Sequence, residues 1–295
     1  MMLPFRLRRA LYGDDSPSAE DADSSSPQPE PESESKLQPT VKTAEYFPSL
    51  WDVLKIRYLL QWKISGGLPV ELVDVIIDAA EYWPSIECRM KDEVVVGTDR
   101  DRVLLKTVPL CYDRKRLENE PSPRPLPHRT VHPCRKILFE LSSRDQGWGP
   151  PRENMYRCSW TWFDTEVIRG AHAKNMYAGG TEQDLLDNEQ GQVRKHYGPN
   201  DKNLLPGDDK LQVNGARVSE KQNVQIIWHY LDHIKPDSPE AHDIEHTRGR
   251  GRSTLDGRGV RELEVGDSIA LWARARFMGW SNHVYAAKVR VFWAV

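Results

Sequence analysis

The sequence predicts a mainly β protein of the α+β type: an antiparallel β-sandwich of the jelly-roll kind, preceded by a helical hairpin and a disordered acidic tail. Residues 266–295 alternate apolar and polar side chains over two runs, the period of strands with one buried face. Further alternating runs precede them, without the regular exchange of strands and helices that builds parallel sheets. Ten Trp and a hydrophobic content of 38% in 295 residues suffice for the core of one or two domains.

The end of the chain carries the strongest strand signal. In the first run, the residues expected on the buried face are Ile269, Leu271, Ala273, Ala275 and Phe277. In the second run they are Tyr285, Ala287, Val289, Val291 and Trp293. Turn residues stand between the runs at Gly279 to Asn282. We therefore expect the two runs to pair as one long antiparallel hairpin at the centre of the core.

The N-terminal part divides into a tail and a pair of helices. Residues 1–42 include a stretch from Asp14 to Lys36 with eight acids and one base, which is too polar to bury a core, so we expect a disordered tail. Residues 43–92 are expected to form a helical hairpin. Ser49 can cap the first helix, and Pro69 fits the first turn of the second.

The remainder of the chain is expected to build the sandwich. Residues 93–131 contain one strand and the Pro-rich segment 121–127, which either separates the helices from the β domain or lies over the sheet. Residues 132–295 form the β-sandwich domain, with strands near 136–143, 156–163 and 224–231. A long polar excursion at 170–222 is expected on the surface.

The second helix resembles a known motif. Leu68-Pro69-x-Glu71-Leu72 followed by Ile76-Ile77 is similar to the opening helix of an F-box, the adaptor module of cullin-type ubiquitin ligases. The resemblance implies that a ligase-core partner docks on Leu68, Pro69, Glu71, Leu72 and Ile76. The same pattern fits an ordinary amphipathic helix that begins with Leu-Pro. In addition, segment 86–91 is polar where an F-box continues with further helices.

Three other segments carry a second resemblance. Residues 132–149, 159–164 and 275–284 resemble a family of uncharacterised filamentous-fungal proteins, and with the Leu-Pro helix the likeness covers nearly everything after Thr43. The family implies no reaction. Its layout, a Leu-Pro helix followed by a β-sandwich, is similar in outline to plant F-box proteins with lectin-like phloem domains.

Two Gly-Trp turns stand at expected strand ends, one at Trp148 and one at Trp280. If both lie at the same end of the sandwich, their indoles form an aromatic platform for a glycan or a peptide. The polar side chains that would add directional hydrogen bonds are Arg144, Asp145, Gln146 and Asn282. The alternative is that both Trp side chains close the ends of the sandwich.

No catalytic triad, phosphate-binding loop or pair of catalytic carboxylates stands out. His229 and His233, and likewise His242 and His246, have a spacing that suits a metal on a helix, but the first pair begins in a predicted strand. We expect neither a metal nor a cofactor. The favoured function is a non-enzymatic recognition or adaptor protein. The alternative is a metal-dependent hydrolase, with Asp145 beside His229 and His233, or a lectin on the same sandwich.

Charge and apolar content limit the partners. The net charge of −3 is mild, and the Arg-Gly run at 248–252 is short enough for a solvated loop, so nucleic acid is not an expected partner. No run approaches the roughly 18 apolar residues that span a bilayer. The four dispersed Cys residues indicate buried thiols in a reducing compartment, the cytoplasm or the nucleus. We expect a protein partner, with a ubiquitin-ligase core as the specific candidate, and a glycan as a second kind of ligand.

Overall fold

The computed structural model describes residues 45–148, 154–173, 193–194 and 197–295. Tyr46–Val295 belong to one compact unit. The expected acidic tail at 1–42 lies outside the described residues, as does the part of the expected excursion at 174–192.

Two helices open the described chain, α1 (Leu50–Trp62) and α2 (Val70–Ala79). Ser49 caps α1: its Oγ accepts a hydrogen bond from the Asp52 amide at 3.2 Å, and Asp52 Oδ2 accepts one from the Ser49 amide at 2.9 Å. The turn between the helices needs glycine at Gly67, where φ is +60° and a Cβ would lie 2.6 Å from the Gln61 carbonyl oxygen. The expected pair of helices is confirmed.

The rest of the structure is two antiparallel sheets of five strands each. The first sheet contains β1 (Ser85–Arg89), β2 (Val94–Gly97), β4 (Cys134–Arg144), β8 (Gln222–His229) and β10 (Ser281–Trp293). The second contains β3 (Arg100–Lys106), β5 (Thr161–Ile168), β6 (Val193–Arg194), β7 (Gln212–Val213) and β9 (Ser268–Ala275).

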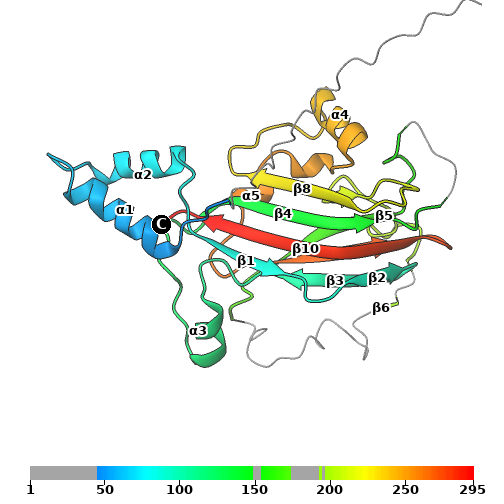
Figure 1. Cartoon of the computed structure of the whole chain (residues 1–295), viewed down its shortest axis with the longest axis horizontal. Helices are drawn as coiled ribbons and strands as arrows, with labels where there is room; N and C mark the ends of the chain where they lie inside the picture. Colours follow the sequence, from blue (N-terminus) through cyan, green and yellow to red (C-terminus); the bar gives the residue numbers. More distant parts are fainter. Residues whose placement is uncertain (1–44, 149–153, 174–192, 195–196) are drawn as a thin grey trace, which may run out of the picture. The chain divides into compact units, whose positions relative to one another are not determined.

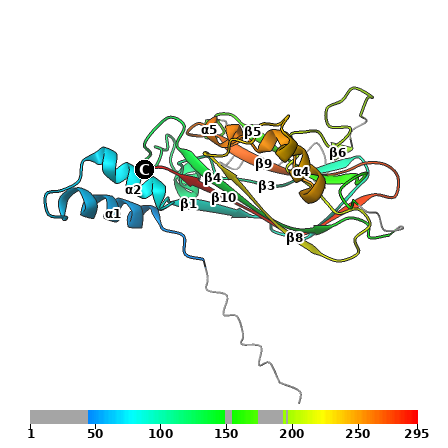
Figure 2. The ribbon, with the colours of Figure 1, turned by 90° about the horizontal axis from the view of Figure 1, so that it is seen from above.

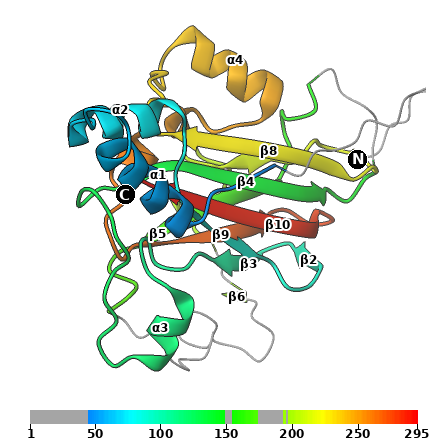
Figure 3. The same ribbon diagram turned by 60° about the vertical axis from the view of Figure 1, so that its left-hand side comes forward.

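Short helices join the strands: α3 (Arg114–Asn119), α4 (Pro239–Arg248), the 3₁₀ turn η2 (Arg252–Thr254) and α5 (Arg258–Arg261). Helix α4 lies beside β8 at one edge of the sandwich (Figures 1 and 3). The segment after α4 covers the neighbouring edge of the second sheet, because the Val213 amide donates to the Gly249 carbonyl at 2.9 Å. This cover protects an edge strand that is otherwise open to pairing with another chain.

The strand order is that of a jelly roll. Along the chain, β1 and β2 pair with β10, β3 with β9, β4 with β8, and β5 with β7, so the antiparallel pairs are nested one inside the other. Nested pairs of this kind roll one antiparallel ribbon into two facing sheets. Figure 2 shows the two layers of strands, with α1 and α2 beyond one end. The predicted β-sandwich of the jelly-roll type is confirmed.

The expected terminal hairpin is wrong. β9 pairs with β3 and β5, whereas β10 pairs with β1, β2 and β4, so the two strands belong to different sheets. Alternation shows which face of a strand is buried, but two strands on facing sheets have the same alternation as two strands of a hairpin. The connection 276–280 crosses from one sheet to the other, with a left-handed φ of +65° at Phe277 and +85° at Gly279.

The sandwich includes residues before the expected boundary at 132, since β1, β2 and β3 pair with strands of the two sheets. The Pro-rich segment 121–127 runs alongside the sandwich: the Pro127 carbonyl accepts a hydrogen bond from the indole N–H of Trp293 at 3.1 Å. Of the two alternatives, the segment therefore lies against the β structure.

The core lies between the facing sheets, where the alternating apolar residues meet. Of the ten residues expected to face it from β9 and β10, eight are buried. The exceptions are Phe277, which is exposed in the connection between the sheets, and Tyr285, whose hydroxyl accepts a hydrogen bond from Arg144 Nε at 2.7 Å. Both exceptions lie near the same end of the sandwich, which suggests that this end has requirements other than core packing.

The outer face of the second sheet carries a buried ion cluster. Arg276 Nη1 and Nη2 donate to the two Asp101 carboxylate oxygens at 2.5 and 2.9 Å, and Arg274 also donates to Asp101. The Arg276 side chain is 1% exposed and lies between the rings of Tyr197 and Trp162, 3.7 and 5.1 Å from their centroids. Burial opposes ionisation of Asp101, but the hydrogen bond from Arg276 and the two arginine charges hold its pKa below the ordinary value.

Candidate functional site

The strands place the candidate residues at two opposite ends of the sandwich. β10 has 13 residues, so it is about 40 Å long at about 3.3 Å per residue. At its start, Ser281 pairs with Gly97. Near its other end, the Phe292 ring lies 5.7 Å from the ring of Phe47, just before α1. We call residues 46–83 the hairpin end, and we call turn 98–99 and loops 145–148, 214–221 and 276–280 the loop end (Figure 1).

The two Gly-Trp turns meet at the loop end. A Cβ on Gly279 would lie 3.3 Å from Cζ2 of Trp148, so the Trp148 indole rests against the Gly279 backbone. Trp148 is 66% exposed, and the neighbouring Phe277 and Met278 are exposed too. The structure thus brings the two turns together and leaves an aromatic side chain open to solvent, as a binding platform requires.

Hydrogen bonds and ring contacts hold loop 276–280 in place. Thr98 Oγ1 donates to the Trp280 carbonyl at 3.2 Å, and the Arg276 amide donates to the Trp160 carbonyl at 2.9 Å. The rings of Trp160 and Phe277 meet edge to face with 4.8 Å between centroids. The exposed aromatic groups of the loop end therefore sit on a defined backbone.

Asp145 organises the loops and is not open to a ligand. Its carboxylate is buried, accepts a hydrogen bond from the Gly147 amide at 2.8 Å and accepts another from the Arg217 amide. Burial raises the pKa of the Asp145 carboxyl above its ordinary value, although these backbone donors favour the ionised form. The side chain fastens the loop after β4 to the loop before β8.

Asn282 is also internal. Its amide oxygen accepts a hydrogen bond from Asn214 Nδ2 at 2.9 Å, and its Nδ2 donates to the Trp162 carbonyl at 3.2 Å. Asn214 in turn accepts from Ser143 Oγ at 2.8 Å and donates to Thr161 Oγ1 at 3.1 Å. This buried network joins strands of both sheets directly beneath the loop end.

The other three expected ligand-binding residues are half-buried. Arg144 donates to the Tyr285 hydroxyl and, at 3.2 Å, to the Asp145 carbonyl. Gln146 Oε1 is buried without a hydrogen-bond partner among the described residues. Trp280 ends loop 276–280, and its amide donates to the Phe277 carbonyl at 3.2 Å. Of the six expected residues, Trp148 is thus the one with a largely exposed side chain.

A groove with a volume of about 460 Å³ lies next to the loop end, between the segment that leads into β5 and helix α4. We call it the α4 groove. Its lining residues are Asn154, Tyr156, Arg157, Cys158, Ser159, Trp160, Leu205, Pro206, Lys210, Val213, His242, Glu245, His246 and Gly249. Trp160 belongs to this lining and also contacts Phe277, so the groove and the loop end are continuous. The volume falls within the range of small-molecule sites, about 300–1,000 Å³.

The charged groups deep in the groove are paired. Lys210 Nζ donates to Glu245 and, at 3.1 Å, to the Gly207 carbonyl. Glu245 also lies 3.0 Å from Arg252 Nε. The guanidinium of Arg157, by contrast, is exposed and has no hydrogen-bond or ion-pair partner in the described part of the chain. Of the lysine and arginine side chains that line the groove, Arg157 is therefore the one without a partner among the described residues.

The α4 groove was not predicted from the sequence. Its lining comes from three separate segments, 154–160, 205–213 and 242–249, and none of them carries a motif. Spacing places Trp160 on the same strand face as Trp162, so the pattern does not indicate that Trp160 lines a groove.

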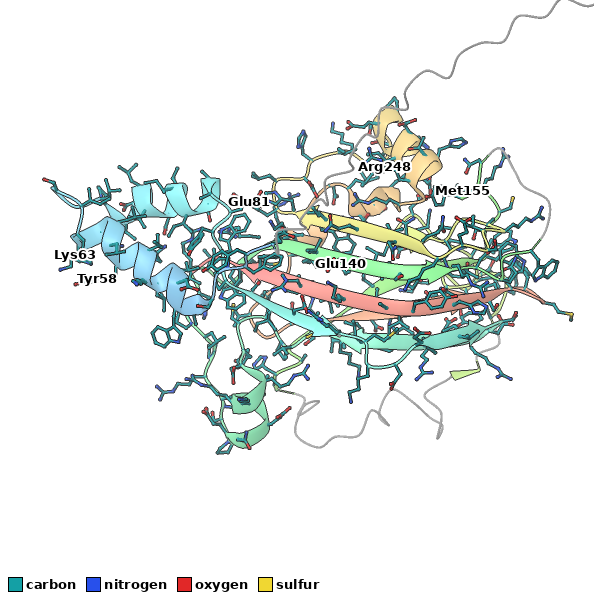
Figure 4. The ribbon with its side chains drawn as sticks, viewed as in Figure 1. Tyr58, Lys63, Glu81, Glu140, Met155 and Arg248 are labelled. Carbon is teal, nitrogen blue, oxygen red and sulfur yellow. The ribbon has the colours of Figure 1, made fainter. Side chains whose placement is uncertain are left out.

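The hairpin end has the opposite character, because large apolar side chains are exposed on both helices. On α1, Trp51 is 77% exposed and Trp62 is 72% exposed, with Tyr58 between them at the spacing of one helical face. On α2, the exposed side chains are Leu72, Val75 and Ile76, again at helical spacing. Figure 4 shows Tyr58 and Lys63 on the part of the hairpin away from the sheets.

Buried contacts and ion pairs fix the hairpin to the sandwich. Val73, Ile77 and Trp83 are buried, and the Trp83 indole N–H donates to Asp78 Oδ1 at 2.8 Å. Arg129, which lies just before β4, contacts Asp78 at 2.5 Å and Asp74 at 3.1 Å. The hairpin therefore keeps one face for the sandwich and exposes another.

The residues expected to dock a partner lie around that second face. Pro69, Glu71, Leu72 and Ile76 are exposed, while Leu68 is half-buried and packs against the core. Sequence reasoning did not identify the aromatic part of the face on α1, where Trp51 and Trp62 are exposed. Their spacing was visible in the sequence, but spacing alone does not say which stripe is buried.

The expected metal donors are not brought together. His229 pairs with Lys136 at one end of β4 and β8, while Asp145 follows the other end of β4, a distance of about 30 Å along the strand. His229 Nε2 lies 3.5 Å from Glu81, and His242 lies beside Arg252. Among the described residues there is no group of three or more His, Cys, Asp or Glu that could hold a metal ion. The set Asp145, His229 and His233 is therefore wrong as a metal site.

Comparisons of the chain with models of protein families, with curated proteins and with solved structures found no match. Both resemblances noted in the sequence therefore stay predictions. Within the described residues, no helix is long and apolar enough to cross a membrane.

Proposed function

We propose that this chain is a non-enzymatic recognition protein that works as an adaptor between two ligands. The exposed apolar face of the hairpin end docks a protein partner. The loop end, at the opposite end of the same strands, binds a glycan or a protein segment.

The observation that carries the proposal is the apolar face of α1 and α2. Isolated exposed apolar residues are normal, but contiguous ones on a surface mark an interaction site. Here Trp51, Tyr58 and Trp62 share one helix with Leu59, and Leu72, Val75 and Ile76 follow on the next. Tryptophan and tyrosine are the residues that contribute most to the energy of protein interfaces.

The partner we propose for this face is the adaptor subunit of a cullin-type ubiquitin ligase. Support comes from Leu68-Pro69-x-Glu71-Leu72, which begins α2 in the manner of an F-box. The chain departs from that module after α2, because β1 starts at Ser85 and pairs with β10. Docking would therefore rely on the two helices alone.

The loop end supports the second half of the proposal. Trp148 and Phe277 are exposed on a backbone that Asp145, Asn214 and Asn282 hold in place. A rigid aromatic surface loses little conformational entropy on binding. Aromatic rings with nearby hydrogen-bonding groups suit a sugar or an extended peptide.

The test is co-elution of the full chain with the purified ligase adaptor subunit in size-exclusion chromatography. A complex is expected for the unchanged chain and is expected to be lost on Leu72→Ser/Ile76→Ser. The matched control is Phe277→Ser/Met278→Ser at the loop end, which is expected to leave the complex intact.

Three results contradict the docking proposal. The first is that the adaptor subunit and the chain elute separately. The second is that the complex survives Leu72→Ser/Ile76→Ser. The third is that the chain alone elutes as a dimer that the same substitutions dissociate, since the face would then serve self-association.

A further inference from the structure

The α4 groove contains a buried polar group that its surroundings leave unpaired. Ser159 is 2% exposed and lines the groove, and its Oγ has no hydrogen-bond partner among the described residues. Burying a hydroxyl without a hydrogen-bond partner lowers the stability of the folded chain. Because Ser159 borders an open volume, a molecule in the groove can supply the missing partner.

The aromatic walls of the groove are fixed before any ligand arrives. Tyr156 packs on Gly249, where an added Cβ would lie 2.5 Å from the ring carbon Cδ1. Trp160 is held by its edge-to-face contact with Phe277. Asn154 Oδ1 accepts hydrogen bonds from the amides of Tyr156 and Arg157 at 2.8 and 3.1 Å, which sets the turn that carries the wall. Flat, preorganised rings of this kind suit the apolar face of a sugar ring.

The charge balance of the groove favours an anion. Lys210 is matched by Glu245, and Arg252 is matched by Asp208, with both Asp208 oxygens 2.7 Å from Nη2. Arg157 remains the available cation, and a guanidinium binds a carboxylate with two parallel hydrogen bonds.

We propose that the α4 groove binds a sugar unit that carries a carboxylate. The ring of the sugar stacks on Trp160 and Tyr156, its carboxylate pairs with Arg157, and one of its hydroxyl groups bonds Ser159 Oγ. This assignment rests on the proposed recognition function of the loop end and names the ligand class that this end takes.

Cys158 provides a direct readout of occupancy. It lines the groove and is the exposed cysteine, while Cys88, Cys111 and Cys134 are buried. A molecule in the groove should shield its thiol, so the rate of alkylation by iodoacetamide falls by a factor of 1 + [L]/Kd. The rate at Cys158 is followed by mass spectrometry of the full chain and its peptides.

Three probes at matched ionic strength separate the possible ligands: glucuronate, glucose and benzoate. At about 100 mM, glucuronate with a Kd of about 10 mM slows alkylation about tenfold. Glucose, which lacks the carboxylate, and benzoate, which lacks the hydroxyl groups, are expected to slow it less than twofold. Arg157→Gln is expected to abolish the effect of glucuronate, while Arg124→Gln, an exposed arginine outside the groove, keeps it.

The assignment is overturned if none of the three probes changes the rate. It is equally overturned if glucose or benzoate protects as well as glucuronate, or if Arg157→Gln leaves the protection intact. These results are independent of docking at the hairpin end, so a chain that still binds the ligase adaptor subunit while Cys158 stays unprotected shows that the sugar assignment alone has failed.

Discussion

The two ends of the sandwich use opposite chemistry on the same strands. At the hairpin end, α1 and α2 expose Trp51, Trp62 and Leu72, and their polar contacts to the sandwich lie on the buried side. At the loop end, polar side chains are internal, with Asp145 and Asn282 fully buried beneath a small exposed aromatic surface. The hairpin end is therefore a broad apolar face on two helices. The loop end is a small aromatic surface whose backbone is held by buried hydrogen bonds.

This difference indicates two kinds of recognition. An apolar helical face binds by removing a large area from water, so the partner is expected to be a protein of similar extent. Buried hydrogen-bond networks fix loop geometry at a cost in stability if any member is lost. Such a cost is expected where the shape of the surface matters, as in a site for a small polar ligand.

The largest effect is expected from removing the strand that both ends share. Truncation after Asn282 deletes most of β10 and leaves β1, β2 and β4 without their common partner. It also removes buried side chains that include Val289, Val291 and Trp293. Each contributes roughly 1.5–3 kcal/mol, against a typical net stability of about 5–15 kcal/mol. The truncated chain is expected to be insoluble.

Removal of residues 1–42 is the matched truncation, and it is expected to leave the melting temperature almost unchanged. Both truncated chains are compared by their yield in the soluble fraction and by calorimetric melting. A soluble 1–282 fragment that melts cooperatively would show that β10 is not the shared support.

The buried ion cluster under the loop end comes next. Asp101→Asn removes the carboxylate that Arg274 and Arg276 share, and leaves them with Asp164 and, at 3.7 Å, Asp99. Loss of the shared partner is expected to lower the free energy of unfolding by about 3–5 kcal/mol. The control is Glu140→Gln, because Glu140 pairs with Lys288 at the partly exposed surface of the first sheet and such pairs contribute about 0–1 kcal/mol. Urea denaturation gives the free energy of unfolding of both variants. Equal losses in the two variants would contradict a stabilising role for the buried ion cluster.

The difference in stability between the unchanged chain and Asp101→Asn is expected to depend on pH. Because the pKa of Asp101 is lowered in the folded state, its contribution to stability is present above the unfolded pKa of about 3.9. That contribution is lost as the pH falls through the lower folded pKa. The difference in stability between the unchanged chain and Asp101→Asn should therefore shrink in acid below about pH 4. A constant difference down to the acid transition would argue against an ionised Asp101.

A smaller effect is expected at the contact between the two Gly-Trp turns. Gly279→Ala places a Cβ 3.3 Å from Trp148 and forces a side chain into a φ of +85°, with an expected loss of about 1–3 kcal/mol. Gly198→Ala is the control, since a Cβ there meets nothing within 4 Å. Urea titration gives the stability and Trp fluorescence follows the indole. The contact is unimportant if the two variants behave alike.

The smallest effect on stability is expected from replacing two buried serines, Ser143 and Ser159, by alanine. Ser143→Ala removes a hydroxyl that donates to Asn214, so a loss of about 1–3 kcal/mol is expected. Ser159→Ala removes one that has no partner in the described chain, so stability is expected to stay the same or to rise by up to about 1–3 kcal/mol. A large loss at Ser159 would mean that it already has a structural role.

Sequence patterns predicted the faces of strands better than their partners. The alternation in β9 and β10 places Leu271 and Val289 correctly in the core, yet the same pattern gave the wrong pairing. Partner choice depends on how the whole ribbon rolls, and this information is spread over distant strands. The jelly-roll class followed from the number and spacing of strands, which needs no single pairing to be right.

Side-chain environment was harder to predict than position. Whether the two Gly-Trp turns share one end was left open by the sequence. They do meet at one end, but Asp145 and Asn282 are internal and not open to a ligand. Arg274 and Arg276 alternate with core residues as a solvated face does, and they are buried because Asp101 and Tyr197 cover them. The local sequence pattern of a strand does not show which distant segments will cover its outer face.

The most direct test of the account is the heat-capacity change when the purified ligase adaptor subunit binds the full chain, measured by titration calorimetry at several temperatures. Burial of an apolar helical face predicts a clearly negative heat-capacity change. This change should shrink together with the affinity in Leu72→Ser/Ile76→Ser, while the stability of the free chain stays the same. The account is contradicted by the absence of binding heat at any temperature, or by a heat-capacity change near zero that the substitutions leave unaltered.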